Sequence, residues 1–346
     1  MNGDRSATVL GFAAAVVVLV ILFWFVGVGE VLDVLAGADL RIVALLVPVA
    51  FVWLSSWGLA LYTVLRVLGT PVSAPMAVLV FSAAVFSNNV TPFGQAGGEP
   101  LSALLISEAA DSEYETGLAA IASVDALHFL PSVGLAAVGL TTVLLGTVSL
   151  GRNLRIAAVA VGVLVLAIPV AAYLGWRYRF EMEAVVARLF TPVVRTLSRL
   201  VPGRSEPSPG VVADRIEGFF AAIDRVAASR RTVVAAVGCS LSGWLALSVS
   251  LWLSTLALGY AVPFAAVLLV IPVGSIAGIT PLPGGLGGIE AAFVVLLVST
   301  TGMPAATASA AVVLHRSATY WLPTFVGGGT AAALGARRGQ QRLGGE

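Results

Sequence analysis

The sequence predicts an all-α integral membrane protein with six full transmembrane helices and two re-entrant helical hairpins arranged as an inverted repeat. The first observation is composition, since 58% of the 346 residues are apolar and 11% are charged, against roughly 25% charged in soluble domains. The second is a mean hydropathy of +0.99. The third is a set of long apolar runs with two matched Pro/Gly-rich interruptions.

Six apolar runs are each long enough to cross a bilayer. A helix rises about 1.5 Å per residue, so about 20 residues span the roughly 30 Å hydrocarbon layer. The first run is longer than a signal-peptide core and has no convincing cleavage site after it, so we expect it to be a membrane helix. The runs are 8–28, 42–65, 117–145, 156–176, 232–258 and 305–334.

Two further apolar regions, 75–110 and 263–300, are interrupted by turns rich in Pro and Gly. Each arm is short for a full crossing, and the interruptions remove helical hydrogen bonds. Irregular backbone at membrane depth survives only when it is buried in protein or lines a wet cavity. We therefore expect each region to form a re-entrant helical hairpin.

The two interrupted regions belong to units that repeat the same order of features: a Thr-Pro pair, a glycine-rich turn, a glutamate and a later Leu-Pro pair. The predicted units are 42–147 and 232–335, joined by a linking helix at 156–176 and a cytoplasmic amphipathic segment at 177–231, within one polytopic domain, 1–346. The span before each hairpin runs in the opposite direction, so the units are antiparallel. Secondary transporters use this arrangement to form a substrate site near the midplane.

The arginines predict the orientation, because short cytoplasmic loops hold the excess of positive charge. With the amino terminus inside, 15 of the 19 Arg residues are cytoplasmic, three are external, and Arg316 lies within a span. We expect both termini to face the cytoplasm from the cytoplasmic membrane. In the segment 177–231, Arg and apolar residues fall on opposite helical faces, and 214–229 repeats the pattern, which predicts helices lying in the headgroup layer.

Glu99 and Glu290 follow the glycine-rich turns, and each opens a helical arm. Capping of free backbone N–H groups is one interpretation. The other is a functional site, because ionisable groups within membrane segments mark pathways, proton relays or paired sites. The turns themselves could hold a phosphate or another anion on their N–H groups. Their glycines are Gly94, Gly97, Gly98, Gly284, Gly285, Gly287 and Gly288.

Arg316 is the one cation predicted deep in the membrane. It stays protonated in proteins and therefore needs a partner, for which Glu290 is the structural candidate and a substrate phosphate the functional one. Asp125 and His128 lie three residues apart on one helical face. They form either a proton relay or a static hydrogen-bonded pair.

Several polar and aromatic residues near the turns and span ends allow a structural interpretation. Asn88, Asn89 and Gln95 either satisfy broken backbone or contact a substrate, whereas Tyr320 and Trp321 are expected at the membrane interface. No spacing of Cys and His predicts a metal site, and no nucleotide or hydrolase motif is present. We expect no cofactor, and the net charge of +1 gives no reason to expect nucleic acid binding.

Three motifs together resemble the lysylphosphatidylglycerol synthase transmembrane-region family over nearly the whole chain. They are Asn-x-x-Thr-Pro-x-x-x-x-Gly-Gly-Glu-Pro at 88–100, Pro-x-Pro-Gly-Gly-Leu-Gly-x-x-Glu at 281–290 and Arg-x-x-x-Tyr-Trp-Leu-Pro at 316–323. Family members are described as flippase-like, either alone or fused to aminoacyl- or glycosyl-transferring domains. The resemblance implies a membrane-embedded site around Glu99, Glu290 and Arg316. Many relatives have Arg shortly after Gly-Glu-Pro, where this chain has Leu101 and Ser102.

The leading functional hypothesis is a flippase-like translocase for an anionic or phosphate-bearing lipid or lipid-linked precursor. The alternatives are a membrane-bound transferase, or a transferase accessory subunit, that acts on polyprenyl-phosphate sugars or aminoacyl lipids, and a scaffold without a substrate. Membrane lipids are the expected partners, with a separate synthase or glycosyltransferase as a possible second one. Without a soluble synthase domain in its sequence, the chain is not expected to transfer lysine by itself.

Overall fold

The computed structural model describes residues 27–70, 72–91, 94–146, isolated positions between 159 and 178, and 209–343. These residues form helices and turns without a strand, which confirms the all-helical prediction. The α-helices are α2 (Val28–Ala36), α3 (Leu40–Val67), α4 (Ala74–Val90), α5 (Gln95–Ala109), α6 (Tyr114–Gly146), α9 (Pro209–Ala228), α10 (Arg230–Ala257), α11 (Phe264–Ser275), α12 (Gly288–Thr301), α13 (Ala305–Arg316) and α14 (Leu322–Leu343). Three short elements are η1 (Ile276–Ile279), η2 (Pro283–Gly285) and η3 (Ser317–Trp321).

Four helical segments are long and apolar enough to cross a membrane: Leu40–Val67, Tyr114–Leu145, Arg230–Ala257 and Pro283–Thr301. The first three coincide with the predicted spans at 42–65, 117–145 and 232–258. The fourth falls in the region for which the sequence predicts a re-entrant hairpin, and that hairpin stays a prediction. The region 305–334 is helical but is not one of the four, and the runs 8–28 and 156–176 lie outside the described residues apart from isolated positions in the second.

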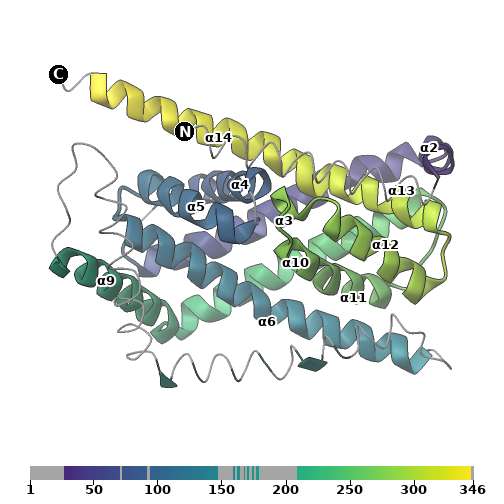
Figure 1. Cartoon of the computed structure of the whole chain (residues 1–346), viewed down its shortest axis with the longest axis horizontal. Helices are drawn as coiled ribbons and strands as arrows, with labels where there is room; N and C mark the ends of the chain where they lie inside the picture. Colours follow the sequence, from purple (N-terminus) through teal and green to yellow (C-terminus); the bar gives the residue numbers. More distant parts are fainter. Residues whose placement is uncertain are drawn as a thin grey trace.

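The long helices α3, α6 and α10 form the body of the molecule, with α4 and α5 toward one end and α11 and α12 toward the other (Figure 1). Helix α3 packs against α10, α4 against α14, and α6 against α11. Glycines permit each approach, because a Cβ at Gly243 would clash with Trp57, one at Gly327 with Ser82, and one at Gly139 with the backbone of Leu269. Such close small-residue contacts are typical of helix pairs in membranes.

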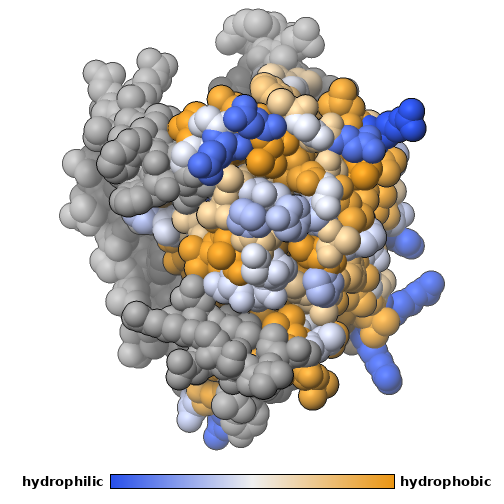
Figure 2. Space-filling view, turned by 90° about the vertical axis from the view of Figure 1, so that its right-hand side faces the viewer, coloured by the Kyte–Doolittle hydropathy of each residue, from blue (hydrophilic) through white to orange (hydrophobic). Residues whose placement is uncertain are grey.

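Large apolar side chains cover the outward faces of these helices. Phe51 on α3, Leu130 on α6, Val234 on α10 and Phe325 on α14 are all exposed. Viewed along the helix axes, from the end that carries α2, charged residues lie at the margin of the described surface and apolar residues surround a weakly polar middle (Figure 2). The apolar outward faces of α3, α6, α10 and α14 fit a bilayer as the solvent.

Helices α13 and α14 form one long helix, interrupted by the π-helical turn η3 (Figure 1). Pro323 lies two residues after this turn, and it has no backbone N–H to donate to the preceding turn. A π-turn absorbs such a defect by adding a residue, and it often marks a functional position. It places Arg316 and Tyr320 on the interior side of the long helix, beside η2 and the end of α4.

Helix α9 has the predicted amphipathic pattern, but its apolar side is covered by protein. Ala222 and Val226 are buried in the main core, and Phe219 and Ile223 pack against it. The neighbour is α6, and Arg215 of α9 pairs with Glu115 of α6 at 3.0 Å. For 214–229, α6 and not lipid therefore covers the apolar side, and the position of the helix in the headgroup layer stays a prediction. The arginines at 188, 195 and 199 lie outside the described residues.

Candidate functional site at the meeting of the two hairpins

The second glycine-rich turn has a backbone that only glycine adopts without strain. Gly284, Gly285 and Gly287 have φ of 56°, 66° and 83°, in the left-handed region. The turn ends at the start of α12, where the N–H of Gly287 donates to Oε2 of Glu290 at 2.5 Å. Glu290 therefore caps the helix, as one sequence interpretation expected. Its second oxygen remains available for another contact.

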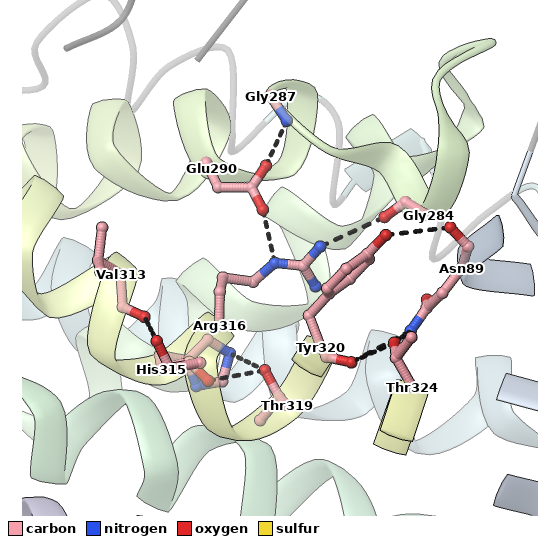
Figure 3. A network of polar contacts seen from close by, with 11 residues as sticks. Asn89, Gly284, Gly287, Glu290, Val313, His315, Arg316, Thr319, Tyr320 and Thr324 are labelled. Atoms are coloured by element: carbon pink, nitrogen blue, oxygen red, sulfur yellow. Dashed lines mark hydrogen bonds and ion pairs between the residues drawn. The ribbon is translucent and has the colours of Figure 1, made fainter. Parts of the chain in front are cut away.

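That second oxygen binds Arg316. The Nε of Arg316 donates to Oε1 of Glu290 at 2.6 Å, and Nη2 donates to the carbonyl of Gly284 at 3.3 Å (Figure 3). The guanidinium carbon lies 4.7 Å from the ring centroid of Tyr320, a cation–π distance. The two side chains of the ion pair are 15% and 9% exposed. The carboxylate expected from the sequence as the partner of Arg316 is thus in place.

Tyr320 and Asn89 join this site to the first hairpin. The hydroxyl of Tyr320 donates to the carbonyl of Asn89 at 3.0 Å, and Nδ2 of Asn89 donates to Oγ1 of Thr324 at 2.8 Å (Figure 3). Gly284 packs between them, since a Cβ there would lie 2.5 Å from the Tyr320 ring and 3.1 Å from the Asn89 backbone. The end of α4, η2 and the π-turn therefore meet at one point.

The first glycine-rich turn contacts the second hairpin as well. A Cβ on Gly94 would lie 3.3 Å from the carbonyl of Gly278, so the first glycine-rich turn lies close to η1 of the second hairpin. Gly98 packs directly against Asn88, and its carbonyl accepts hydrogen bonds from the hydroxyls of Ser87 and Ser102, each at 3.0 Å. These contacts hold the start of α5 against the end of α4. The side chain of Gln95 lies outside the described residues.

The predicted site residues fall into two groups. Arg316, Glu290 and Asn89 belong to the group described above, together with Gly284, Gly285, Gly287 and Gly288 of the second turn. Glu99 belongs to the other group, because it is half-buried on α5, and α5 packs against α6, the helix that carries Asp125. Oδ1 of Asp125 lies 3.9 Å from Nδ1 of His128. Asn88, Gly94, Gly97 and Gly98 lie in the first hairpin, between these groups.

Sequence reasoning missed Tyr320 and Thr324. Tyr320 was expected at the membrane interface, but it is only 2% exposed and contacts Arg316 and Asn89. Its spacing from Arg316, four residues along one helix, was the available signal. Trp321, the neighbouring aromatic, is 50% exposed.

The arrangement is suited to binding an anion. Arg316 has five N–H donors, of which two bind Glu290 and Gly284 among the described residues. A guanidinium presents paired donors that match phosphate and carboxylate geometry. The described residues hold no group of three His, Cys, Asp or Glu side chains placed for a metal ion.

Comparison with known proteins gives consistent results. The family described as "Lysylphosphatidylglycerol synthase TM region" matches residues 8–327. A UPF0104 membrane protein of Methanothermobacter thermautotrophicus is 27% identical over 94% of this chain and 92% of its own length. A UPF0104 membrane protein of Pyrococcus horikoshii is 23% identical over 90% of this chain and 93% of its own. Glycosyltransferase AglD of Haloferax volcanii is 30% identical over 90% of this chain, which spans 52% of that enzyme.

Proposed function

Because this chain belongs to the lysylphosphatidylglycerol synthase transmembrane-region family, we propose that it is a flippase-like translocase. It moves an anionic or phosphate-bearing lipid, or a lipid-linked precursor, across the cytoplasmic membrane. The observation that carries the proposal is the position of Arg316, a largely buried cation beside the second glycine-rich turn, where the end of α4 meets η2 and the π-turn. A cation at such depth marks a pathway or a paired site, and here the pair has donors left for a headgroup.

The pattern of helix packing supports an inverted repeat. Helix α3 of the first unit pairs with α10, its counterpart in the second. Helix α4 packs on α14, and α11 packs on α6, so each hairpin contacts the last helix of the other unit. A two-fold axis between α3 and α10 would exchange these contacts, as expected for antiparallel units around a midplane site.

The ends of the second hairpin support a re-entrant path. Leu258, before α11, packs with Val31 of α2 and Ala306 of α13 in one apolar cluster. The N–H of Asp39 donates to the carbonyl of Ala257 at 2.8 Å at the same end. These contacts support a path in which the chain enters and leaves the second hairpin on one side of the membrane, which the Arg distribution assigns to the exterior, with both termini in the cytoplasm.

The ion pair explains how the site binds a headgroup while Arg316 always has a counter-charge. While the site is empty of substrate, Glu290 neutralises Arg316. An anionic headgroup takes over part of this role as it binds Arg316, so the cation stays paired throughout. Uncompensated charge in a membrane interior is costly, which gives the exchange its selectivity for anions.

A groove lies farther along α4 and α14 from this site. It has a volume of about 340 Å³ between α4 and α14 and is lined by Met76, Leu79, Val326, Gly329 and Ala333, among others. Val326 is two residues beyond Thr324, the partner of Asn89. We assign the groove to an acyl or prenyl chain whose headgroup is bound at Arg316, because hydrocarbon gains packing contacts there and carries no polar group to satisfy.

The proposal is tested with purified protein in proteoliposomes. Labelled phosphatidylglycerol, labelled polyprenyl phosphate and labelled phosphatidylcholine are compared by the accessibility of their label to a membrane-impermeant quencher. We expect movement of one or both anionic probes above protein-free vesicles and no stimulation of the zwitterionic probe. Equal stimulation of all three, or of none, in folded protein would contradict a translocase selective for anions.

The similarity to glycosyltransferase AglD favours one second candidate. In it the chain acts on polyprenyl-phosphate sugars as a transferase or as the accessory subunit of one. Transfer of sugar from a labelled polyprenyl-phosphate donor, with the purified chain or with a co-purifying enzyme, supports this candidate. Lipid movement without any transfer supports the translocase.

A further inference from the structure

The group formed by Glu99, Asp125 and His128 has no role in the proposed headgroup site. His128 is only 6% exposed, and its Nδ1 points at the carboxylate of Asp125. Its ring stacks on Trp57 with 4.2 Å between centroids, and Nε1 of Trp244 donates to its backbone carbonyl at 3.0 Å. Helices α3 and α10 thus hold the imidazole in place against α6.

Polar atoms in this group lack hydrogen-bond partners among the described residues. They are Oδ2 of Asp125 and Nε2 of His128. A buried polar atom without a partner costs on the order of 1–3 kcal/mol, so a chain keeps several together where they bind something. The geometry therefore indicates a binding site rather than packing.

The corresponding residues of the second unit, Glu290 and Arg316, indicate what the group of Glu99, Asp125 and His128 binds. Glu290 and Arg316 lie 26 residues apart. Glu99 and Asp125 have the same separation in the first unit. The Leu-Pro pair of the first unit follows Asp125 one residue sooner than the Leu-Pro pair of the second unit follows Arg316. This difference matches the extra residue that the π-turn adds to the second unit. Asp125 thus takes the place of Arg316, and an acid pair replaces the ion pair.

Among the described residues, no Arg forms an ion pair with Glu99 or Asp125. From α3 and α10 the described neighbours of His128 are aromatic, and Phe81 of α4 lies 6.4 Å from its ring. Helix α11, which also packs on α6, has no charged residue. Arg215 of α9 is engaged by Glu115, ten residues or about 15 Å of helix before Asp125. Two half-buried carboxylates on packed helices, without an Arg partner among the described residues, disfavour each other's ionised form.

We infer that Glu99 and Asp125 form a proton-binding site, positioned by His128, which couples lipid movement to the proton gradient. The coupling rests on the proposed translocase function, whereas the proton site does not. One carboxylate takes up a proton from one side of the membrane, and the resulting carboxylic acid releases it to the other. No other reactant is consumed.

Infrared difference spectroscopy on the full chain in lipid nanodiscs tests the proton site. We expect a C=O band of a protonated carboxyl group at neutral pH that is lost in Asp125→Asn or in Glu99→Gln. The band should remain in Glu30→Gln, a control at an exposed carboxylate on α2. Absence of the band from folded wild-type protein overturns the inference. Because Asp125→Asn and Glu99→Gln are measured separately, the test stays decisive if one of these two variants fails to fold.

The coupling is tested in proteoliposomes with labelled phosphatidylglycerol and an imposed pH gradient. We expect the gradient to accelerate movement in wild type and in Glu30→Gln, and this response to be lost in Asp125→Asn. A protonated-carboxyl band without any response to the gradient contradicts the coupling. Absence of lipid movement from wild type under all conditions contradicts the proposed function instead, and the infrared result still decides the proton site.

Discussion

Arg316 is stabilised by three groups of different kinds: a carboxylate, a backbone carbonyl and an aromatic face. Removing Glu290 alone leaves a buried cation without its counter-charge. Breaking a buried pair in this way costs about 3–5 kcal/mol, whereas removing both charges together is much less harmful. The two single variants and the double variant therefore separate folding from transport.

We predict that Glu290→Gln lowers the thermal stability of the purified protein strongly, and that Glu290→Gln with Arg316→Gln recovers most of the loss. Neither variant is expected to move labelled phosphatidylglycerol. Size-exclusion chromatography after heating measures the stability, with Glu30→Gln as the control at an exposed site. Restored lipid movement in the double variant would assign the pair a structural role only.

For single residues, the sequence predicts the kind of partner that a side chain requires better than it predicts which residue supplies that partner. Because an unpaired cation in the membrane is costly, the sequence predicted a carboxylate partner for Arg316, and Glu290 is that partner. The role of Tyr320 depends on a contact with Asn89, 231 residues away, which no local pattern contains. The separation of Glu99 from Arg316 likewise depends on how the two hairpins pack.

Among the elements, the turn η2 has the tightest requirement for glycine. An alanine at Gly284 meets two penalties, a left-handed backbone that costs roughly 1–2 kcal/mol and a Cβ that collides with Tyr320. Gly302 has a similar φ of 70° but open space around it. It is therefore a matched control for backbone strain alone.

We predict that Gly284→Ala lowers the melting temperature more than Gly302→Ala and also slows lipid movement, because Tyr320 must leave its place beside Arg316. Thermal unfolding and the lipid assay are measured on both variants. An equal loss of stability in the two would show that the contact with Tyr320 adds nothing.

The groove between α4 and α14 can be filled without disturbing the backbone. Gly329 borders it, and a Cβ there meets no atom within 4 Å. Gly134 on α6 is also exposed and free of neighbours but lies outside the groove. We predict that Gly329→Phe slows movement of labelled phosphatidylglycerol several-fold and that Gly134→Phe has little effect. Similar rates in both variants would remove the groove from the lipid path.

The elements were predictable where one physical requirement dominates. Spans at 42–65, 117–145 and 232–258 follow from length and hydropathy, and α3, α6 and α10 match them. The π-turn was not predictable, because Pro alone does not produce one: α6 contains Pro131 and stays α-helical from Tyr114 to Gly146. The apolar face of α9 was visible in the sequence, but the choice between lipid and α6 as its cover depends on the tertiary fold.

For the whole molecule, the re-entrant path makes a prediction about sidedness. In a Cys239→Ser background, single cysteines at Ala36, Tyr260 and Ala305 should react with an impermeant thiol reagent from outside the cell. Cysteines at Glu113 and Arg231 should react only after permeabilisation. All five positions are exposed. Labelling of Tyr260→Cys and Ala305→Cys from opposite sides would mean that the second hairpin crosses the membrane completely.

The central claim is that the enclosed Arg316 receives the headgroup of a translocated anionic lipid. The most direct test is the initial rate at which labelled phosphatidylglycerol changes leaflet in proteoliposomes with wild type, Arg316→Gln and Arg41→Gln. Arg41, at the exposed start of α3, controls for the loss of one positive charge. We expect wild-type rates in Arg41→Gln and a loss to the protein-free rate in Arg316→Gln. Undiminished movement in folded Arg316→Gln protein would contradict the account.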